Sequence, residues 1–451
     1  MRLAFTLLFL LTISLGAADK PRLLVTTDIG GDPDDCQSLV RLLMYSNEFE
    51  IEGLIASASG TPGELGEAVT RPDMIRQRVK TYGKVLDNLR VHDSDYPDTS
   101  TLLNCIKSGN KNRGKDYIGK GHDSEASEFI ISVVDKNDPR PLNIAIWGGQ
   151  TDLAQALWRV RQERSPEELA EFINKIRVYD IADQDGLFSW IHDEFPDVWY
   201  ILNKAPKDQD KRDAVFRGMY LGGNEDLTSK TWLRAHISQN HGPLGALYPD
   251  EGLWTAPNPH SALKEGDTPS WFYFLRTGLN DPLHPEWGGW GGRFREVEPG
   301  LFRDAKDAVS DTKSARATVW RWRQDFQNHF AARMDWCIDA PYANHAPNAV
   351  VNGDSTIDAL KLAVAPGETI YLNAGQSGDP DGDELNFHWW IYPEPGTYPD
   401  VMKITDPNQI ELSLETPDDL GKKSFHVILK VTDDGEPALT SYRRILIAGA
   451  K

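Results

Sequence analysis

The chain of 451 residues contains only three cysteines, so at least one thiol stays unpaired and a disulfide framework is excluded. Basic residues are also scarce, because 48 lysines and arginines face 68 aspartates and glutamates, for a net charge of −20. Such an acidic surface repels phosphate backbones and anionic lipids, and we expect neither nucleic acid nor membranes as partners. No apolar run beyond the N-terminal region is long enough to cross a bilayer.

The first residues have the pattern of a secretory signal peptide. Arg2 precedes an apolar stretch from Leu3 to Leu15, and the small residues Gly16 to Ala18 then lead to Asp19. That stretch is too short for a stable membrane span. We therefore predict a signal peptide at residues 1–18 and a mature protein that is secreted or periplasmic.

The length predicts two or three domains, and the first of them has the pattern of an α/β fold. Segments compatible with helices, such as Ala126–Val134 and Thr151–Arg161, separate short apolar runs. These runs are Arg22–Thr26, Ile51–Ser57, Leu142–Trp147 and Ile176–Ile181. The alternation predicts a mostly parallel, open, Rossmann-like sheet over residues 19–339, covered on both faces. Such sheets bind ligands beyond the carboxyl ends of their strands.

The chain changes character after this domain. Residues 340–354 are rich in Pro, Ala and Asn without periodicity, which predicts a linker. Short β runs separated by turns such as "GDPDGDE" follow, and they predict an all-β, Ig-like sandwich at residues 355–451. Trp389 and Trp390 are neighbours in one run and must point to opposite faces. We expect one in the core and the other available for glycan adhesion or for docking on the first domain.

Four carboxylates gather directly after the first expected strand. The stretch "TTDIGGDPDDCQSL" places Asp28, Asp32, Asp34 and Asp35 within eight positions, where like charges repel. Hard oxygen ligands suit Ca²⁺, which takes six to eight of them, and a carboxylate beside the ion can deprotonate water. One loop cannot complete this shell, so other strand ends must contribute. The alternative is an ordinary Asp- and Gly-rich turn.

This loop resembles the signature of the nucleoside hydrolase superfamily, D-x-D-x-x-x-D-D after the first strand. Asp28 matches the first aspartate, and Asp34 and Asp35 match the final pair. The second aspartate of the signature falls on Gly30, and Asp32 is an extra carboxylate two positions later.

Two later segments resemble the same superfamily. "WGGQTDLAQAL" at Trp147–Leu157 is similar to the G-P-L-T-N-L-A segment, which makes Thr151 the residue whose carbonyl ligates calcium. "EGDTPSWFYFL" at Glu265–Leu275 is similar to the H-D-P-L-A helix start, with Gly266 at the position of the histidine. The resemblance implies Asp34 as the catalytic base and a Ca²⁺ ion held by Asp28, Asp35, Thr151 and Asp267, with Asp32 as auxiliary.

Five spaced motifs point to a narrower group. "TTDIGGDPDD", "DQDG", "GPLGALYPDEG", "EGDTPS" and "GGWGGRF" together resemble a bacterial exported family that joins a nucleoside hydrolase-like domain to a C-terminal sandwich. That family is described as cellulose-binding, and the resemblance covers nearly all of the mature chain. It implies a carbohydrate or nucleoside substrate, with a polysaccharide as a further candidate partner, and leaves the oligomeric state open.

Two further motifs are candidates for substrate binding. "DIADQDG" follows an expected strand, so Asp183 and Gln184 should lie on the ligand-binding rim, although such a loop also caps a following helix. "WGGWGGRF" offers Trp290 for stacking on a sugar ring and Arg293 for polar contact, although tryptophans are more often core residues.

Two functions follow from these patterns. The first is a secreted hydrolase that cleaves a glycosidic bond, either an N-riboside or a furanose-like O-glycoside, with water activated by Asp34 at a Ca²⁺ site. The second is a non-catalytic protein that binds polysaccharide, namely cellulose, through aromatic side chains of both domains. The missing second aspartate and the missing histidine favour the second function.

Overall fold

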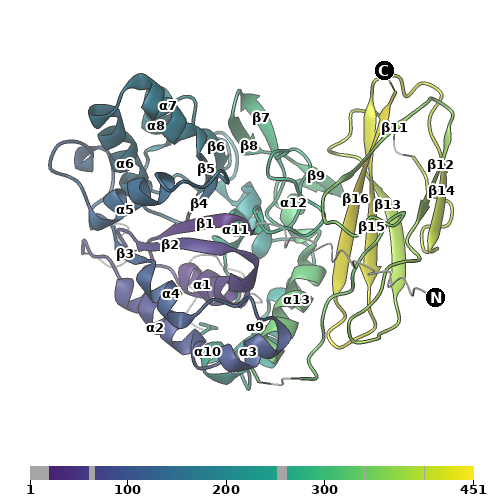
Figure 1. Ribbon diagram of the computed structural model, residues 1–451, viewed down its shortest axis with the longest axis horizontal. Coiled ribbons are helices and arrows are strands. Elements are labelled where there is room, and N and C mark those ends of the chain that lie inside the picture. Colours follow the sequence, from purple (N-terminus) through teal and green to yellow (C-terminus); the bar gives the residue numbers. More distant parts are fainter. Residues whose placement is uncertain (1–19, 60–66, 251–261, 339–340, 401, 451) are drawn as a thin grey trace, which may run out of the picture.

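The computed structural model describes residues 20–59, 67–250, 262–338, 341–400 and 402–450. An α/β domain and a smaller β domain lie side by side along the long axis of the molecule (Figure 1). The expected signal peptide at residues 1–18 lies outside the described residues. Among the residues described, none of the helices combines the length and the apolar character that a bilayer span requires.

An eight-stranded sheet organises the first domain, in the order β3-β2-β1-β4-β5-β6-β8-β7. All neighbours in it are parallel except β7 and β8, which confirms the expected mostly parallel sheet. The strands are β1 (Arg22–Thr27), β2 (Glu50–Ala56), β3 (Ile106–Ser108), β4 (Leu142–Ile146), β5 (Ile176–Ile181), β6 (Trp199–Asn203), β7 (Phe294–Glu298) and β8 (Leu301–Asp304).

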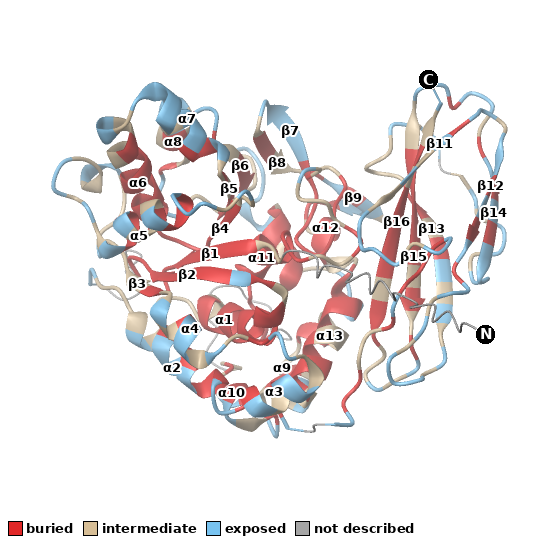
Figure 2. Cartoon of the chain, viewed as in Figure 1, coloured by how far each residue is buried: buried red, intermediate tan, exposed pale blue. Residues whose placement is uncertain are grey.

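Both faces of the sheet are buried, and this explains the continuous apolar runs of the sequence. Successive side chains of a strand point to opposite faces. Leu23 and Val25 accordingly belong to one hydrophobic cluster, whereas Leu24 between them belongs to another. Figure 2 shows the central strands buried along their length.

Helices cover the two faces of the sheet. One face packs on α5 (Glu125–Val134), α6 (Gln150–Glu163), α7 (Pro166–Asn174) and α8 (Phe188–Glu194). The other packs on α1 (Asp34–Met44), α2 (Pro72–Tyr82), α3 (Leu86–His92), α4 (Thr99–Asn104), α9 (Lys230–Leu233), α10 (Gly242–Gly245), α11 (Thr268–Phe272), α12 (Ala317–Trp320) and α13 (Arg323–Asp335). The helices expected at 126–134 and at 151–161 are therefore confirmed.

The second domain is a β-sandwich, as the sequence predicts. One sheet has the order β11-β16-β15-β13 and the other pairs β12 with β14. The strands are β11 (Leu360–Val364), β12 (Thr369–Asn373), β13 (Asn386–Tyr392), β14 (Glu411–Glu415), β15 (Ser424–Thr432) and β16 (Thr440–Gly449). Their pairings are antiparallel except for β11 with β16. Leu372, Leu412, Trp389 and Val427 come from both sheets and share one core.

The second half of the expected linker belongs to the sandwich instead. Asn348 pairs with Gly378, and Val351 pairs with Asp354. Ala349 and Val351 are buried in the sandwich core. The sequence does not predict this, because the few apolar residues of the segment show no strand or helix periodicity. The segment is nevertheless part of the domain, because Ala349 and Val351 pack in its core.

The two domains are joined by buried polar contacts. Asp307, at the start of the short strand β9 (Asp307–Val309), which pairs with β10 (Thr312–Ser314), is fully buried. Its carboxylate accepts hydrogen bonds from Arg293 (2.7 Å), Arg321 (2.7 Å) and the Tyr392 hydroxyl of the sandwich (2.6 Å). A buried carboxylate with two guanidinium partners holds the domains in one orientation.

The adjacent tryptophans divide as expected. Trp389 is fully buried in the sandwich core, and its indole N–H donates to the carbonyl of Gln409 at 2.9 Å. Trp390 faces the first domain, where its ring centroid lies 5.8 Å from that of Trp322. Of the two alternatives, docking on the first domain is the one that the structure shows.

Candidate active site: an acidic cluster at the carboxyl end of the sheet

Three carboxylates from distant parts of the sequence meet at the carboxyl end of the sheet. Asp34 and Asp35 begin α1 directly after the loop that follows β1, and Asp267 directly precedes α11. An oxygen of each lies within 4.8 Å of the others. We call Asp28, Asp32, Asp34, Asp35 and Asp267 the acidic site.

Local structure holds these acids in place. The Thr27 hydroxyl at the end of β1 donates to Asp35, and Asp34 accepts a hydrogen bond from the Asp35 amide at 3.2 Å. Both acids lie in the first turn of α1, where the positive end of the helix dipole favours negative charge. Asp267 is 2 % exposed, and its Oδ2 is buried without a hydrogen-bond partner among the described residues.

A buried ion pair brings the two segments together. Arg41 on α1 binds the Glu265 carboxylate through two nitrogens, at 2.5 and 3.1 Å, and both side chains are fully buried. Ser38, one turn earlier on α1, accepts a hydrogen bond from Thr268 at 3.1 Å. These contacts fix the turn that carries Asp267 against the helix that carries Asp34.

The clustered negative charges of the site require compensation, either by protons or by a cation. Burial raises the pKa of Asp34 well above its usual range, and the charges of Asp32 and Asp28 raise it further. Burial and neighbouring carboxylates raise the pKa values of Asp35 and Asp267 in the same direction. Because the donors are all carboxylate oxygens and one of them has no partner, the residues present fit Ca²⁺.

The two remaining acids border this group. Asp28 is 7 % exposed, and its Oδ2 lies 3.8 Å from a guanidinium nitrogen of Arg113. The loop after β4 touches it, because a Cβ at Gly148 would lie 2.7 Å from its Cγ. The charge of Asp32 raises the pKa values of Asp34 and Asp267 further, so it lies close to both of them.

The missing second aspartate has a backbone explanation. Gly30 has a φ of +113°, a conformation that L side chains rarely adopt. A Cβ there would lie 3.0 Å from Cγ of Arg71 and 3.3 Å from the sulfur of Met74. A carboxylate at this position would therefore face α2, and Asp32 supplies the extra charge of the loop instead.

The missing histidine also falls beside the acids. A Cβ at Gly266 would lie 3.2 Å from Oδ2 of Asp34 and 3.2 Å from the ring of Phe216, in the 3₁₀ turn Val215–Met219. The glycine thus leaves an aromatic ring next to the expected catalytic base.

Thr151 lies on the correct rim but binds another partner. It stands in the first turn of α6, where its amide and hydroxyl donate to Asp185 at 2.8 and 2.6 Å. Gly148 of the same loop lies against Asp28. A calcium contact through the Thr151 carbonyl stays a prediction.

Asp183 and Gln184 also have protein partners. Asp183 accepts hydrogen bonds from the amide of Phe188, the first residue of α8 (2.9 Å), and from Lys204 (2.9 Å). The amide nitrogen of Gln184 donates to the carbonyl of Trp147 at the end of β4. The structure gives Asp183 the helix-capping role, and a contact of either residue with substrate stays a prediction.

Trp290 and Arg293 lie at the domain interface, away from the acidic site. Arg293 is 8 % exposed and bound to Asp307, so we reassign it from substrate binding to domain docking. Trp290 is 2 % exposed and packs against Phe272 and Phe326. The "WGGWGGRF" pattern could not reveal this, because a Gly-rich aromatic run suits both a sugar-binding loop and a buried turn.

Two basic residues near the acids did not figure in the sequence analysis. Lys264 is 1 % exposed with its ammonium 5.1 Å from the Tyr220 ring centre, and burial lowers its pKa while Asp32 and Asp34 counteract this. Arg113 follows β3. Lys264 stands three positions before Asp267 and could have been noticed, whereas nothing in the sequence connects Arg113 with Asp28.

The parallel sheet with acids at its carboxyl end defines the class of nucleoside hydrolase-like proteins. The family model "Cellulose-binding Sde182, nucleoside hydrolase-like domain" matches residues 22–294, more than half of the chain. The model "Cellulose-binding protein Sde0182, C-terminal domain" matches residues 369–449. The chain belongs to this cellulose-binding family with a nucleoside hydrolase-like domain.

One solved structure is similar over nearly the whole chain. It is a nucleoside hydrolase-related hypothetical protein from Saccharophagus degradans that is associated with carbohydrate metabolism. The two sequences are 34 % identical, the similarity covers 95 % of this chain and 100 % of that chain, and the TM-score is 0.80. A search of curated proteins found no match.

Proposed function

We propose that the acidic site is the catalytic centre of an exported hydrolase that cleaves a glycosidic bond. The observation that carries the proposal is the convergence of Asp34, Asp35 and Asp267 within 4.8 Å, with a buried, unpartnered oxygen on Asp267. Buried like charges are costly unless a cation or a proton accompanies them. Perturbed carboxylates at the carboxyl end of a parallel sheet are typical of functional sites.

Ca²⁺ is the cofactor that we propose. The carboxylates of Asp28, Asp35 and Asp267 would hold it, with Asp32 and the Thr151 carbonyl as further ligands. Bound Ca²⁺ would supply the positive charge that keeps these acids ionised and that orients a water molecule and sugar hydroxyls.

The residues of the chain perform the proton transfer. Asp34 accepts a proton from the attacking water, and the water oxygen forms a bond to the anomeric carbon. The bond from that carbon to the leaving group breaks, its electron pair goes to the leaving group, and the leaving group takes a proton from solvent. The surrounding carboxylates stabilise the positive charge that grows on the sugar ring. Because Gly266 and Phe216 replace the histidine, an O-glycoside fits this site better than a nucleoside.

Replacing Asp34 with asparagine tests the proposal. The purified protein is screened against aryl glycosides and nucleosides with Ca²⁺ or with a chelator, and Asp34→Asn abolishes turnover while the protein still folds. Asp152→Asn is the matched control, because Asp152 is 1 % exposed, has a pKa raised to about 6 by burial, and occupies the asparagine position of the superfamily segment. Unchanged turnover in Asp34→Asn would remove this residue from catalysis.

Binding without turnover is the second candidate, and it is favoured by Gly30 and Gly266 at two functional positions of the superfamily. It predicts that the full chain is retained on cellulose and that no glycoside or nucleoside of the panel is cleaved. Turnover that is lost when the chelator is added would support the hydrolase and contradict binding without turnover.

A further inference from the structure

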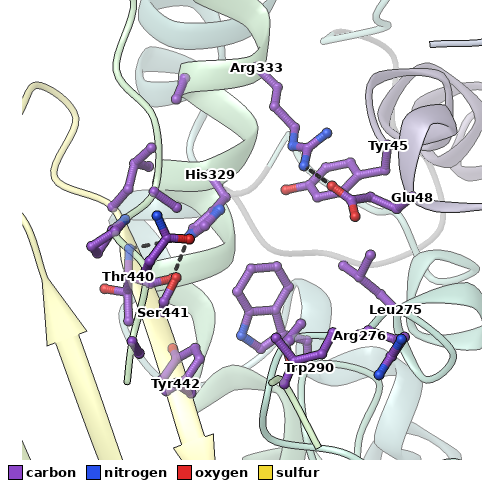
Figure 3. Close-up of a pocket in the computed structure, with 18 of the residues that line it drawn as sticks. Tyr45, Glu48, Leu275, Arg276, Trp290, His329, Arg333, Thr440, Ser441 and Tyr442 are labelled. Atoms are coloured by element: carbon purple, nitrogen blue, oxygen red, sulfur yellow. Dashed lines mark hydrogen bonds and ion pairs between the residues drawn. The ribbon is translucent and has the colours of Figure 1, made fainter. Parts of the chain in front are cut away.

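A cavity lies between the two domains, apart from the acidic site. Its volume is about 380 Å³, within the range of small-molecule sites. The first domain contributes Tyr45, Trp290, His329 and Arg333, and strand β16 of the sandwich contributes Ser441 and Tyr442 (Figure 3). No residue of the acidic site lines it.

Two hydrogen-bond donors on the cavity wall are poorly satisfied. The hydroxyl of Tyr45 is buried and has no hydrogen-bond partner among the described residues. The indole N–H of Trp290 is buried beside the Tyr442 hydroxyl, without a hydrogen bond of good geometry. A buried unpartnered donor costs about 1–3 kcal/mol, so native proteins rarely keep one without a ligand or water. Burial also raises the pKa of Tyr45 to about 12, which keeps its hydroxyl a neutral donor.

Charges at the cavity are already compensated. Arg333 forms an ion pair with Glu48, donates to the Met44 carbonyl at 2.9 Å and lies 4.2 Å from the Tyr45 ring centre. His329 contacts the Thr440 carbonyl at 2.8 Å, and burial lowers its pKa to about 4, which leaves the imidazole neutral. Arg276, a third basic residue of the wall, is paired with Asp358 at 2.8 Å. The described part of the wall therefore offers neutral donors and aromatic rings, and its basic side chains already have acidic or carbonyl partners.

The cavity reaches solvent at its rim. The Glu48 side chain is 35 % exposed, and Ile357 from the sandwich is 39 % exposed. A small ligand can thus enter between the domains and contact both of them.

We propose that this cavity binds one or two rings of a neutral saccharide. Sugar hydroxyls accept hydrogen bonds from Tyr45 and Trp290, and the apolar faces of the rings pack on the aromatic walls. A bound saccharide contacts both domains and stabilises their docking by mass action. This site needs no turnover, so it goes beyond the hydrolase proposed above, and it gives Trp290 a sugar contact at a place other than the acidic site.

Binding of cellobiose to the full chain tests the proposal. Wild-type protein binds cellobiose in calorimetric titrations and its melting temperature rises with the disaccharide concentration. Tyr45→Phe removes only the unpartnered hydroxyl, so the protein folds at least as stably and its affinity for cellobiose falls about 3- to 10-fold. Trp290→Phe removes the other donor and lowers the affinity by a similar factor.

Two controls separate this site from the rest of the molecule. Tyr371→Phe, at a tyrosine that is 73 % exposed on β12, leaves the affinity unchanged. Asp34→Asn also leaves it unchanged, so loss of the hydrolase would not be mistaken for loss of this site. No binding by the wild type, or equal affinity in Tyr45→Phe, would overturn the proposal.

Discussion

The acidic site and the interdomain cavity each contain a buried polar atom without a partner, yet they differ in charge. The acidic site gathers carboxylates that raise one another's pKa. The cavity presents the neutral donors of Tyr45 and Trp290 beside a closed ion pair. Unpartnered acceptors of one charge sign call for a cation, whereas unpartnered neutral donors call for a neutral acceptor. A buried polar atom without a partner therefore indicates a cation when it is a carboxylate oxygen, and a neutral acceptor when it is an uncharged donor.

The largest effect is expected from breaking the domain interface at Asp307, a residue that lines neither the cavity nor the acidic site. Asp307→Asn leaves Arg293 and Arg321 buried beside Tyr392 without a full countercharge, and the free energy of unfolding falls by about 3–5 kcal/mol. Chemical denaturation measures this change, and cellobiose titration reports the cavity.

Asp135→Asn is its control, because the pair of Asp135 with Arg164 at 2.6 Å is partly exposed at the surface and contributes less than about 1 kcal/mol. Calcium affinity of Asp307→Asn should equal that of the wild type. A matching loss of calcium affinity would show that the two sites are not independent.

The second largest effect is expected on calcium affinity, when a carboxylate of the acidic site is removed. Asp267→Asn removes one of three clustered charges, so the affinity for Ca²⁺ falls about 100-fold, because ligand charge sets calcium affinity. Isothermal titration measures this loss, with Asp152→Asn as the control that retains full affinity.

The same variant should be more stable than the wild type in chelator, because it relieves like-charge repulsion among buried groups. Its affinity for cellobiose stays unchanged. Wild-type calcium affinity in Asp267→Asn would contradict the proposed ligand set.

The two regions should also differ in pH dependence: buried acids make stability depend on pH, whereas cellobiose binding in the cavity should not. Burial, with the charge of Asp183, raises the pKa of Asp180 to about 8 from the ordinary value of 3.8. The folded state then keeps a proton that the unfolded state loses, so the free energy of unfolding falls as pH rises from about 4 to 8, by at most about 1.4 kcal/mol per unit.

Denaturation at pH 5 and at pH 7 measures the total slope, and Asp180→Asn reduces it by the contribution of this one carboxyl, while the other buried acids with raised pKa values keep theirs. Cellobiose affinity should stay constant over the same range, because His329, with its pKa lowered to about 4, remains neutral. An equal slope in wild type and Asp180→Asn would assign the pH dependence to other groups.

The smallest effect is expected at Gly30, which stands where the superfamily signature has its second aspartate. Gly30→Asp restores the superfamily residue but places a side chain at a φ of +113°, 3.0 Å from Arg71. We expect a loss of about 1–2 kcal/mol in unfolding free energy, measured by thermal unfolding, and no gain in calcium affinity. A tighter calcium site in this variant would show that the loop can turn its side chain toward the acids.

The sequence predicted local patterns well and long-range partnerships poorly. Strands β1, β4 and β5 were foreseeable because burial on both faces leaves continuous apolar runs, and Asp267 was foreseeable through a motif resemblance. The contact of Arg113 with Asp28, and the capping role of Asp183, depend on which loops meet at the rim. Neither has a signature in the order of residues.

By itself, the sequence determined the two-domain organisation, the parallel sheet and the concentration of acids behind β1, because apolar periodicity and charge spacing are local properties. Only the tertiary structure decided that Asp267 joins Asp34 through the Arg41–Glu265 ion pair, that Arg293 belongs to the domain interface, and that Tyr45 and Trp290 share a cavity. These contacts arise when segments far apart in the chain pack together, and packing depends on the shapes and charges of partners that no single segment contains.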